Sequence, residues 1–145
     1  MTERAGQTRP MRERVAAIIE RDRRVLMVRQ RARGPSGRHD GFEYLTLPGG
    51  GIDEGEAPQD AIAREVREEV GLSVTQTSYL RRVELPEGAT TLFRVDVEDG
   101  PAVLGTDPDL TCDCPRLAGL AWVVAPTDEE WRSEAVACHL RIKLT

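Results

Sequence analysis

The sequence predicts an α/β domain built from packed layers. Short apolar, often β-branched segments alternate with two segments that have helical spacing and capping signals. At 145 residues, the chain is long enough to form one domain with a sizeable core. We therefore expect a single domain over residues 11–145, preceded by a polar and flexible tail over residues 1–10.

Six segments are expected to form strands, because they are apolar-rich and are bounded by turn-forming residues. They cover residues 14–20, 25–30, 44–47, 73–85, 90–97 and 117–125. Asp22 and Arg23 are expected to form a turn that joins the first two strands as a hairpin. The third strand leads the chain into a run of three glycines.

A helix is predicted to run from Pro58 to Val70. Pro58 suits the first helical turn, where its missing N–H is not needed, and Gly71 is suited to end the helix. At about 100° per residue, Ile62, Val66 and Val70 form one apolar stripe. We expect this stripe to pack against a sheet.

A second helix is predicted to begin at Thr127. Thr127 and Glu130 have the spacing of a capping box, in which each residue satisfies a backbone N–H of the other. The residues that follow at helical spacing, and that we expect to pack on the sheet, are Trp131, Ala135, Cys138 and Ile142.

Three glutamates gather at the margin of the first helix. Glu65, Glu68 and Glu69 lie beside its apolar stripe by the same helical geometry. Neighbouring carboxylates repel one another and are costly to keep ionised at a partly buried margin. Mg²⁺ would make the cluster favourable, since it prefers oxygen ligands from carboxylates, phosphate and water. Taken alone, however, Arg64 and Glu68 at a spacing of four are typical of a solvated helix face.

The segment from Gly50 to Leu72 resembles the Nudix box at every defined position. The nine matching positions, spread over twenty-three residues, are Gly50, Glu56, Arg64, Glu65, Val66, Glu68, Glu69, Gly71 and Leu72. Chance agreement at this many positions is remote, so the chain is identified as a member of the Nudix hydrolase family. The resemblance implies an α/β/α sandwich with a mixed β-sheet, in which the catalytic helix directly follows the glycine loop.

The resemblance also implies roles for the charged residues of the box. Glu65 and Glu69 correspond to the principal metal ligands, and Glu68 to either a further ligand or the general base. Glu56 corresponds to a supporting carboxylate near the metal. Arg64 corresponds to the residue that orients a glutamate through a charge-assisted hydrogen bond.

The glycine-rich loop is expected to come close to the ligand. The resemblance implies that Gly50 makes a tight turn with its carbonyl facing the metal. The run of Gly49, Gly50 and Gly51 also fits a loop that needs positive φ and a close approach to substrate. Arg29 and Arg31 share one face of the second strand near its end, where either could contact a substrate phosphate or remain in solvent.

The implied reaction is hydrolysis of a nucleoside diphosphate linked to another moiety, at a phosphoanhydride bond. Mg²⁺ (or Mn²⁺) would act as a Lewis acid and lower the pKa of bound water, whose proton a glutamate would accept. The base could instead come from Asp107, Asp109 or Asp113 in a downstream loop, which is otherwise typical of an ordinary turn.

ADP-ribose or a related nucleotide sugar is the favoured substrate, and a nucleoside triphosphate is the alternative. Pro86 lies fourteen residues after Leu72, close to but not at the position where a proline is associated with ADP-ribose cleavage in the family. No tyrosine follows Tyr79, so the tyrosine linked to dinucleoside polyphosphate cleavage is absent. A module that only binds nucleotide is disfavoured, because every ligand glutamate of the box is present.

Charge is distributed unevenly along the chain. Residues 1–38 contain eleven arginines and four acidic residues, a balance of +7, whereas the remaining residues have a balance of −12. A basic rim that guides polyphosphate toward the acidic site is consistent with this asymmetry. Nucleic-acid binding is disfavoured, because no Phe or Tyr occurs before Phe42.

Other features of the sequence bear on compartment and partners. No apolar run approaches eighteen residues and residues 1–14 lack an apolar core, so neither a membrane-spanning helix nor a secretory signal is expected. Three cysteines, Cys112, Cys114 and Cys138, argue against a disulfide framework and favour partly buried thiols in a reducing cytoplasm. The expected partner is a small nucleotide, and the resemblance also allows a homodimer.

Overall fold

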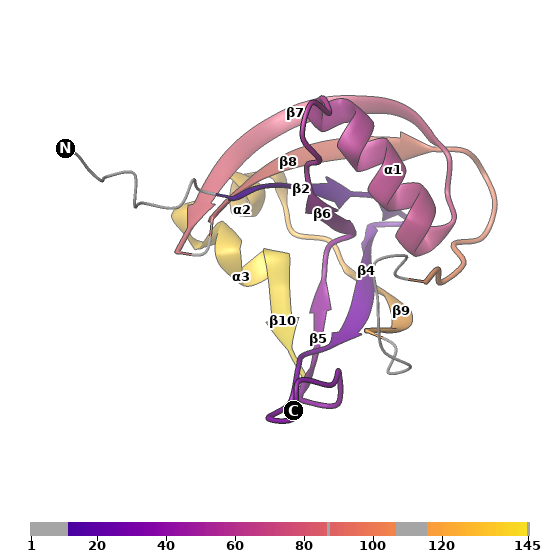
Figure 1. The fold of residues 1–145 in the computed structure, drawn as a ribbon. Helices are drawn as coiled ribbons and strands as arrows, with labels where there is room; N and C mark the ends of the chain where they lie inside the picture. The colour runs from indigo at the N-terminus through magenta and orange to yellow at the C-terminus, as the bar shows by residue number, and fades with distance from the viewer. Residues whose placement is uncertain (1–11, 87, 107–115, 145) are drawn as a thin grey trace.

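The computed structural model describes residues 12–86, 88–106 and 116–144 (Figure 1). The predicted tail over residues 1–10 lies outside these ranges. So do the loop aspartates and two of the cysteines, namely Asp107, Asp109, Asp113, Cys112 and Cys114.

The strands form two sheets. The first has the order β6 (Gly49–Gly51), β2 (Arg12–Ile18), β8 (Gly88–Val97) and β7 (Val74–Leu85). The second has the order β10 (Arg141–Lys143), β5 (Glu43–Thr46), β4 (Arg24–Arg31) and β3 (Glu20–Arg21), with β9 (Leu117–Val124) also paired to β4. In the first sheet, β2 runs parallel to β8, whereas β6 pairs antiparallel with β2 and β7 pairs antiparallel with β8. The sheet is therefore mixed, as predicted.

The helix predicted from Pro58 to Val70 is confirmed at both ends. Helix α1 (Pro58–Val70) has Pro58 in its first turn. Gly71 follows in the left-handed conformation at φ 68°, and its N–H donates to the carbonyl of Arg67. The stripe of Ile62, Val66 and Val70 is fully buried.

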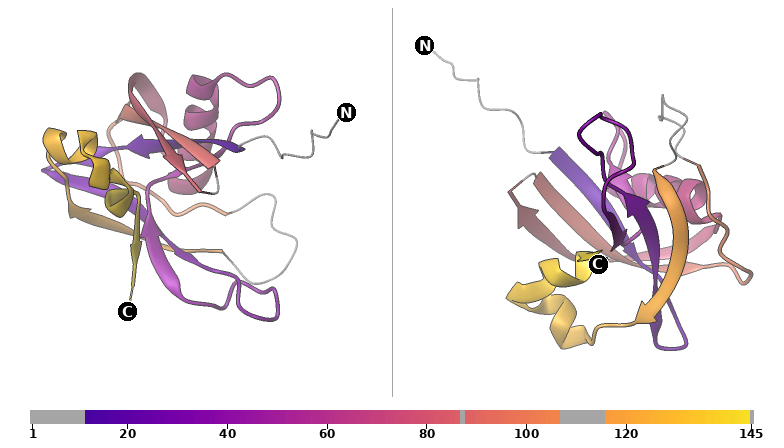
Figure 2. Two further views of the ribbon diagram at one scale, coloured as in Figure 1. Left: turned by 90° about the vertical axis from the view of Figure 1, so that its left-hand side faces the viewer. Right: turned by 90° about the horizontal axis from the view of Figure 1, so that it is seen from below.

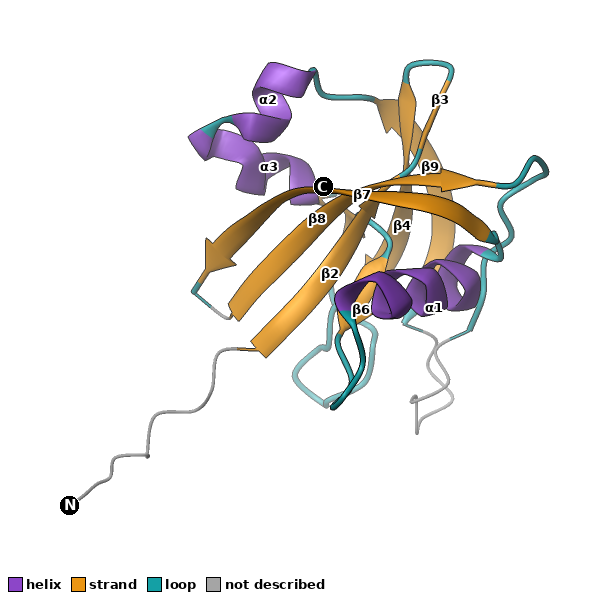
Figure 3. Ribbon diagram, turned by 90° about the horizontal axis from the view of Figure 1, so that it is seen from above, coloured by secondary structure: helices purple, strands orange, loops and turns teal. Residues whose placement is uncertain are grey.

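Helical segments cover both sides of the strands, which confirms the predicted α/β/α arrangement (Figures 2 and 3). On one side, the stripe of α1 packs with Val15, Leu26 and Val28. On the other side, the neighbouring strand positions pack with α2 (Asp128–Arg132) and α3 (Ala137–Leu140). The buried residues of that second core include Ala16, Ile18, Val25, Met27, Trp131, Val136 and Leu140. Both faces of β2 and β4 are therefore covered.

The predicted hairpin of residues 14–20 with 25–30 is wrong over most of its length. β2 pairs with β6 and β8, and only the short β3 pairs with β4, with Glu20 opposite Val25. The turn at Asp22 and Arg23 is confirmed, and both residues have positive φ. A strand that is apolar on both faces does not reveal which neighbour it pairs with, so its local pattern could not separate the two sheets.

The predicted second helix is correct only for its first turn. The capping box of Thr127 and Glu130 is confirmed, but the helix ends at Ser133, whose hydroxyl and N–H both donate to the carbonyl of Glu130. The chain then forms a 3₁₀ turn, η1 (Glu134–Val136), before α3 and β10. Serine offers the backbone a local alternative to helical hydrogen bonds, which explains the break.

The break changes which side chains are buried. Ala135, Cys138 and Ile142 are exposed, contrary to the prediction, and Cys138 is a free, exposed thiol. Val136 and Leu140 occupy the core instead, beside Trp131.

The glycine run also differs from its prediction. None of Gly49, Gly50 and Gly51 has positive φ, and the three residues form β6, antiparallel to β2. The sheet hydrogen bonds of this short strand explain its extended backbone. Among the helices that the structure describes, none is long and apolar enough to cross a membrane.

Candidate active site

Strand β6 runs beneath α1, and its glycines let the two approach closely. A Cβ atom added to Gly50 would lie 2.7 Å from the carboxylate of Glu65. A Cβ on the next residue, Gly51, would meet only the end of the Arg12 side chain at 3.6 Å. Glycine at position 50 thus leaves room for the carboxylate of Glu65 to lie directly on the backbone, and a side chain there would displace it.

Arg64 ties the start of the box to the helix. Its Nε and Nη2 each donate to one oxygen of Glu56 at 2.9 Å, which is a bidentate pair. Its Nη1 donates to Glu65 at 2.7 Å and to Glu68 at 3.4 Å, and Nη2 also donates to the carbonyl of Gly51 at 3.1 Å. The hydrogen bonds from Arg64 are the main reason that the pKa of Glu56 is lowered to about 2.

Glu69 is the most deeply buried of the three helix glutamates, with 3 % of its surface exposed. Its Oε1 accepts from the N–H of Gly49 at 3.1 Å, and its Oε2 accepts from Nη2 of Arg116 at 3.2 Å. Burial raises the pKa of Glu69, whereas the Gly49 and Arg116 contacts act in the opposite direction. The side chain is therefore fixed in one orientation by partners from two distant segments.

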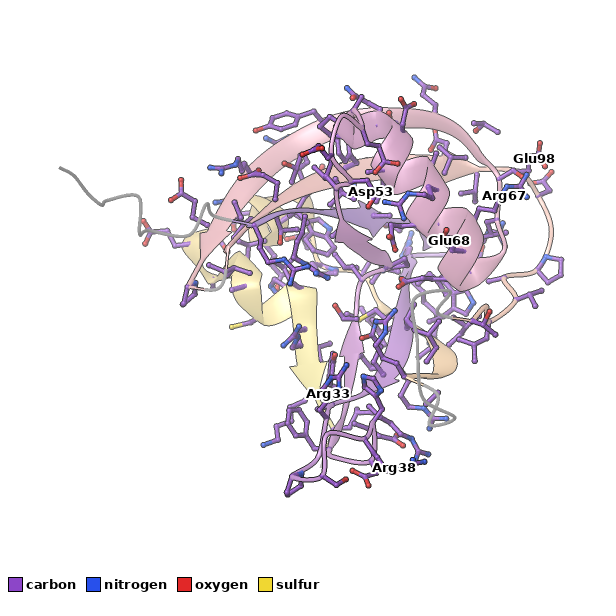
Figure 4. All side chains as sticks on the ribbon, viewed as in Figure 1. Arg33, Arg38, Asp53, Arg67, Glu68 and Glu98 are labelled. Carbon is purple, nitrogen blue, oxygen red and sulfur yellow. The ribbon has the colours of Figure 1, made fainter. Side chains whose placement is uncertain are left out.

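Glu65 and Glu68 differ from Glu69 in exposure. The Glu65 side chain is 13 % exposed, and burial followed by the charge of Glu69 raises its pKa to about 7. The Glu68 side chain, labelled on α1 in Figure 4, is 33 % exposed. Its carboxylate contacts Arg64 at 3.4 Å. Two carboxylates that are costly to ionise side by side are suited to a divalent cation.

The oxygens of this site fit a divalent cation by their chemistry. Glu65 and Glu69 supply hard oxygen donors, and Glu68 could add a third. Among the residues that the structure describes, no three acidic, histidine or cysteine side chains already converge on one point. Arg64 instead bridges Glu65 and Glu68.

Arg29 and Arg31 are not brought to these glutamates. Their guanidinium groups pair with Glu43 of β5 at 3.6 and 3.2 Å, and their side chains are 45 % and 47 % exposed. Arg29 also donates to the carbonyl of Ala118 in β9. The two arginines therefore lie on an exposed part of the second sheet.

Four other arginines, which the sequence did not single out, line a cavity of about 480 Å³ that also borders Gly49. They are Arg12, Arg14, Arg116 and Arg141. Burial lowers the pKa of Arg14, and the positive charges of Arg12 and Arg141 lower it further. Only Arg14 could have been noticed from the sequence, because it is a charged residue near the start of an otherwise apolar strand.

The raised pKa of Glu65 predicts that the metal-free protein loses stability as the pH rises. A carboxyl group with a higher pKa in the folded state stabilises the fold while it is protonated, and this stabilisation is lost between its ordinary value of 4.5 and about 7. In EDTA, the free energy of unfolding of the wild type, relative to Glu65→Gln, should fall by on the order of 2 kcal/mol across this range. Urea unfolding at acidic and mildly alkaline pH measures the difference.

Glu54→Gln controls for the removal of one negative charge, since Glu54 is an exposed residue of the preceding loop. This control should keep the pH dependence of the wild type. Parallel stability curves for the wild type and Glu65→Gln would contradict the prediction.

Comparisons with known proteins agree with this geometry. A family model described as NUDIX domain matches residues 10–131. The NAD-capped RNA hydrolase NudC of Klebsiella pneumoniae (strain 342) is 31% identical over 114 residues, which cover 77% of this chain and 42% of that protein. The CTP pyrophosphohydrolase of Escherichia coli (strain K12) is 36% identical over 70 residues, or 48% of each chain. The chain thus spans about half the length of the curated relatives that it matches.

Among solved structures, a MutT NUDIX hydrolase from Burkholderia pseudomallei superposes with a TM-score of 0.60 at 25% identity. The match covers 80% of this chain and 87% of that one. The similarity therefore extends over most of both chains.

Proposed function

Because the chain belongs to the Nudix family, we propose that it is a metal-dependent hydrolase that cleaves a phosphoanhydride bond in a nucleoside diphosphate linked to another group. The observation that carries the proposal is the seating of Glu65 and Glu69 against β6. Glu65 lies directly on the backbone of Gly50, and Glu69 is held by Gly49 and Arg116. Two neighbouring carboxylates in fixed positions, one buried and one largely buried, are suited to hold Mg²⁺ or Mn²⁺.

In this proposal, each residue of the box has a separate task. Glu65 and Glu69 hold the metal, which when bound supplies Lewis-acid stabilisation of the phosphate oxygens and a more acidic water. Arg64 fixes the orientation of Glu65, and Glu56 in turn fixes Arg64. These roles are supported by the short contacts of Arg64, which reach Glu65 within the helix and Glu56 in the preceding loop.

Glu68 is our proposed general base. It is the most exposed of the three helix glutamates. Its contact with Arg64, 3.4 Å, is longer than the 2.7 Å contact of Glu65, which leaves Glu68 less constrained. A carboxylate that water can reach is suited to accept the proton of the attacking water. Asp107, Asp109 and Asp113 remain alternative bases and lie outside the described residues.

Two substrate classes follow from the sequence and its relatives. ADP-ribose or a related nucleotide sugar is supported by the similarity to a hydrolase of NAD-capped RNA, since NAD contains an ADP-ribose unit. A nucleoside triphosphate is supported by the similarity to a CTP pyrophosphohydrolase.

A substrate panel tests the proposed function. We expect turnover of at least one nucleotide in Mg²⁺ or Mn²⁺ and its loss in EDTA, because the glutamates need the cation to bind and activate phosphate. Mass analysis of the products in ¹⁸O-labelled water identifies the phosphorus that is attacked. Binding of nucleotides without metal-dependent turnover of any of them would indicate a module that only binds.

A further inference from the structure

The charged side chains that line the cavity beside the glutamates are all positive. It is bordered by four arginines, and no aspartate or glutamate occurs among the described residues that line it. Its volume, about 480 Å³, lies within the range of small-molecule sites. A cationic cavity of this size next to a phosphate-cleaving centre points to an anionic ligand.

Three of the four arginines have no carboxylate in direct contact among the described residues. In the part of the chain that the structure describes, the guanidinium groups of Arg12 and Arg14 make no hydrogen bond or ion pair. The guanidinium of Arg141 lies over the ring of Tyr44, with its Cζ 4.6 Å from the ring centre. Arg116 differs, because it already holds Glu69.

Two of these arginines also lie close enough to repel the third. The charges of the exposed Arg12 and Arg141 both disfavour the charged form of Arg14, which is itself half-buried. The charges of Glu65 and Glu69 act in the opposite direction but more weakly, and these two carboxylates are the ones that a bound cation would occupy. Like charges that gather at a half-buried position are unfavourable unless a ligand of opposite charge joins them. An anion bound among them would relieve this repulsion and accept several charge-assisted hydrogen bonds.

The scissile diphosphate alone does not account for three such charges. Each phosphate of a diphosphate between two ribose groups carries a single negative charge, and a divalent cation at Glu65 and Glu69 is itself offset by these two carboxylates. The two phosphates therefore match two of the three arginines and leave one unmatched. A further phosphate adds roughly −1.5 to −2. Three arginines next to the metal site therefore match a substrate with more phosphate than a plain nucleotide sugar.

We infer that Arg12, Arg14 and Arg141 select a substrate that carries at least one phosphate in addition to the two at the scissile bond. The inference rests on the proposed function and specifies the substrate class of the same site. The additional phosphate is either the end of a polyphosphate chain or a phosphate on the ribose. The apolar part of the lining, Leu47, Leu85 and Leu140, is left for the uncharged portion of the substrate.

Matched substrate pairs test the inference. CTP and CDP differ by one chain phosphate, and NADP and NAD differ only by a ribose phosphate. In Mg²⁺, we expect kcat/KM to favour the phosphate-rich member of at least one pair by about tenfold or more, which one charge-assisted hydrogen bond can supply. A preference confined to the first pair places the additional phosphate in the chain, and one confined to the second pair places it on the ribose. Equal values within both pairs would overturn the inference.

Arginine variants link any preference to the cavity. Arg12→Gln and Arg141→Gln should each reduce the ratio of kcat/KM values within the preferred pair severalfold. Arg132→Gln is the matched control, since Arg132 is exposed on α2 and does not line the cavity, and it should keep the wild-type ratio. An unchanged ratio in both cavity variants would assign the preference to other residues and overturn the inference.

Binding without turnover separates this inference from the proposed function. In EDTA, calorimetry should detect inorganic tripolyphosphate binding to the wild type, weaker binding to Arg12→Gln and Arg141→Gln, and a decrease with added salt. If no nucleotide is hydrolysed, the proposed function fails while this measurement still tests the arginines. Absence of tripolyphosphate binding to the metal-free wild type at low salt would count against the arginine site alone.

Discussion

Glu69→Gln is expected to lower kcat by roughly three orders of magnitude, because loss of a metal-binding carboxylate removes several kcal/mol of transition-state stabilisation. Glutamine keeps the shape of the side chain but loses its charge. An amide oxygen is a poorer ligand for a hard cation than a carboxylate oxygen, so both metal affinity and charge neutralisation should decrease.

The fold should survive this substitution. The amide oxygen of glutamine can still accept from the N–H of Gly49, which holds Glu69 in the wild type. Burial raises the pKa of Glu69, so the neutral amide removes a charge that is costly to bury. This gain offsets the loss of the pair with Arg116.

Steady-state kinetics at saturating Mg²⁺ and circular dichroism together check the result. Glu98→Gln is the matched control, because Glu98 lies on the exposed turn after β8, away from Glu68 (Figure 4). It should behave as the wild type. A folded Glu69→Gln protein that keeps more than about one tenth of wild-type kcat would contradict the assignment of Glu69 to the metal.

Gly50→Ala should lower kcat by about a hundredfold or more, whereas Gly51→Ala should have little effect. At position 50, the new Cβ would lie 2.7 Å from the carboxylate of Glu65, so that this group must move away from its position on β6. A catalytic group displaced by about 1 Å can cost about a hundredfold in rate. At position 51, the Cβ would only touch the flexible end of Arg12.

The two variants are well matched. Both glycines lie in β6, neither has positive φ, and both lose the same backbone freedom on replacement by alanine. Kinetics of the two proteins under identical conditions, with thermal unfolding of each, separate the displacement of Glu65 from a general weakening of the strand. Equal kcat values for the two variants would show that contact with Gly50 does not position Glu65.

Elements with local signals could be predicted from the sequence, and elements fixed by distant contacts could not. Helix α1 was predicted at both ends because Pro58 and Gly71 are adjacent to the residues that they delimit. The C-terminal region was predicted incorrectly because residues 141–143 gain hydrogen bonds from β5, nearly a hundred positions earlier. Helical spacing in the sequence does not show that pairing with β5 competes with the continuation of the helix.

The same distinction applies to the candidate site. The glutamates of α1 and Arg64 belong to one continuous segment, so their spacing could indicate a common site. Arg116 reaches Glu69 only because β9 pairs with β4, and Arg14 and Arg141 meet only in the folded chain. Arg29 looked suitable from alternation along its strand, but its guanidinium pairs with Glu43 of the neighbouring strand.

The segment formed by α3 and β10 supplies one wall of the cavity, through Ala137, Leu140 and Arg141, and is joined to β5 as an edge strand. The residues of the box lie on another segment, α1 and β6. This part of the proposed recognition site is thereby encoded in a stretch of the gene separate from that of the helix glutamates. Diversifying residues 137–141 offers a route to enzymes with altered substrate range whose hydrolytic machinery is inherited unchanged.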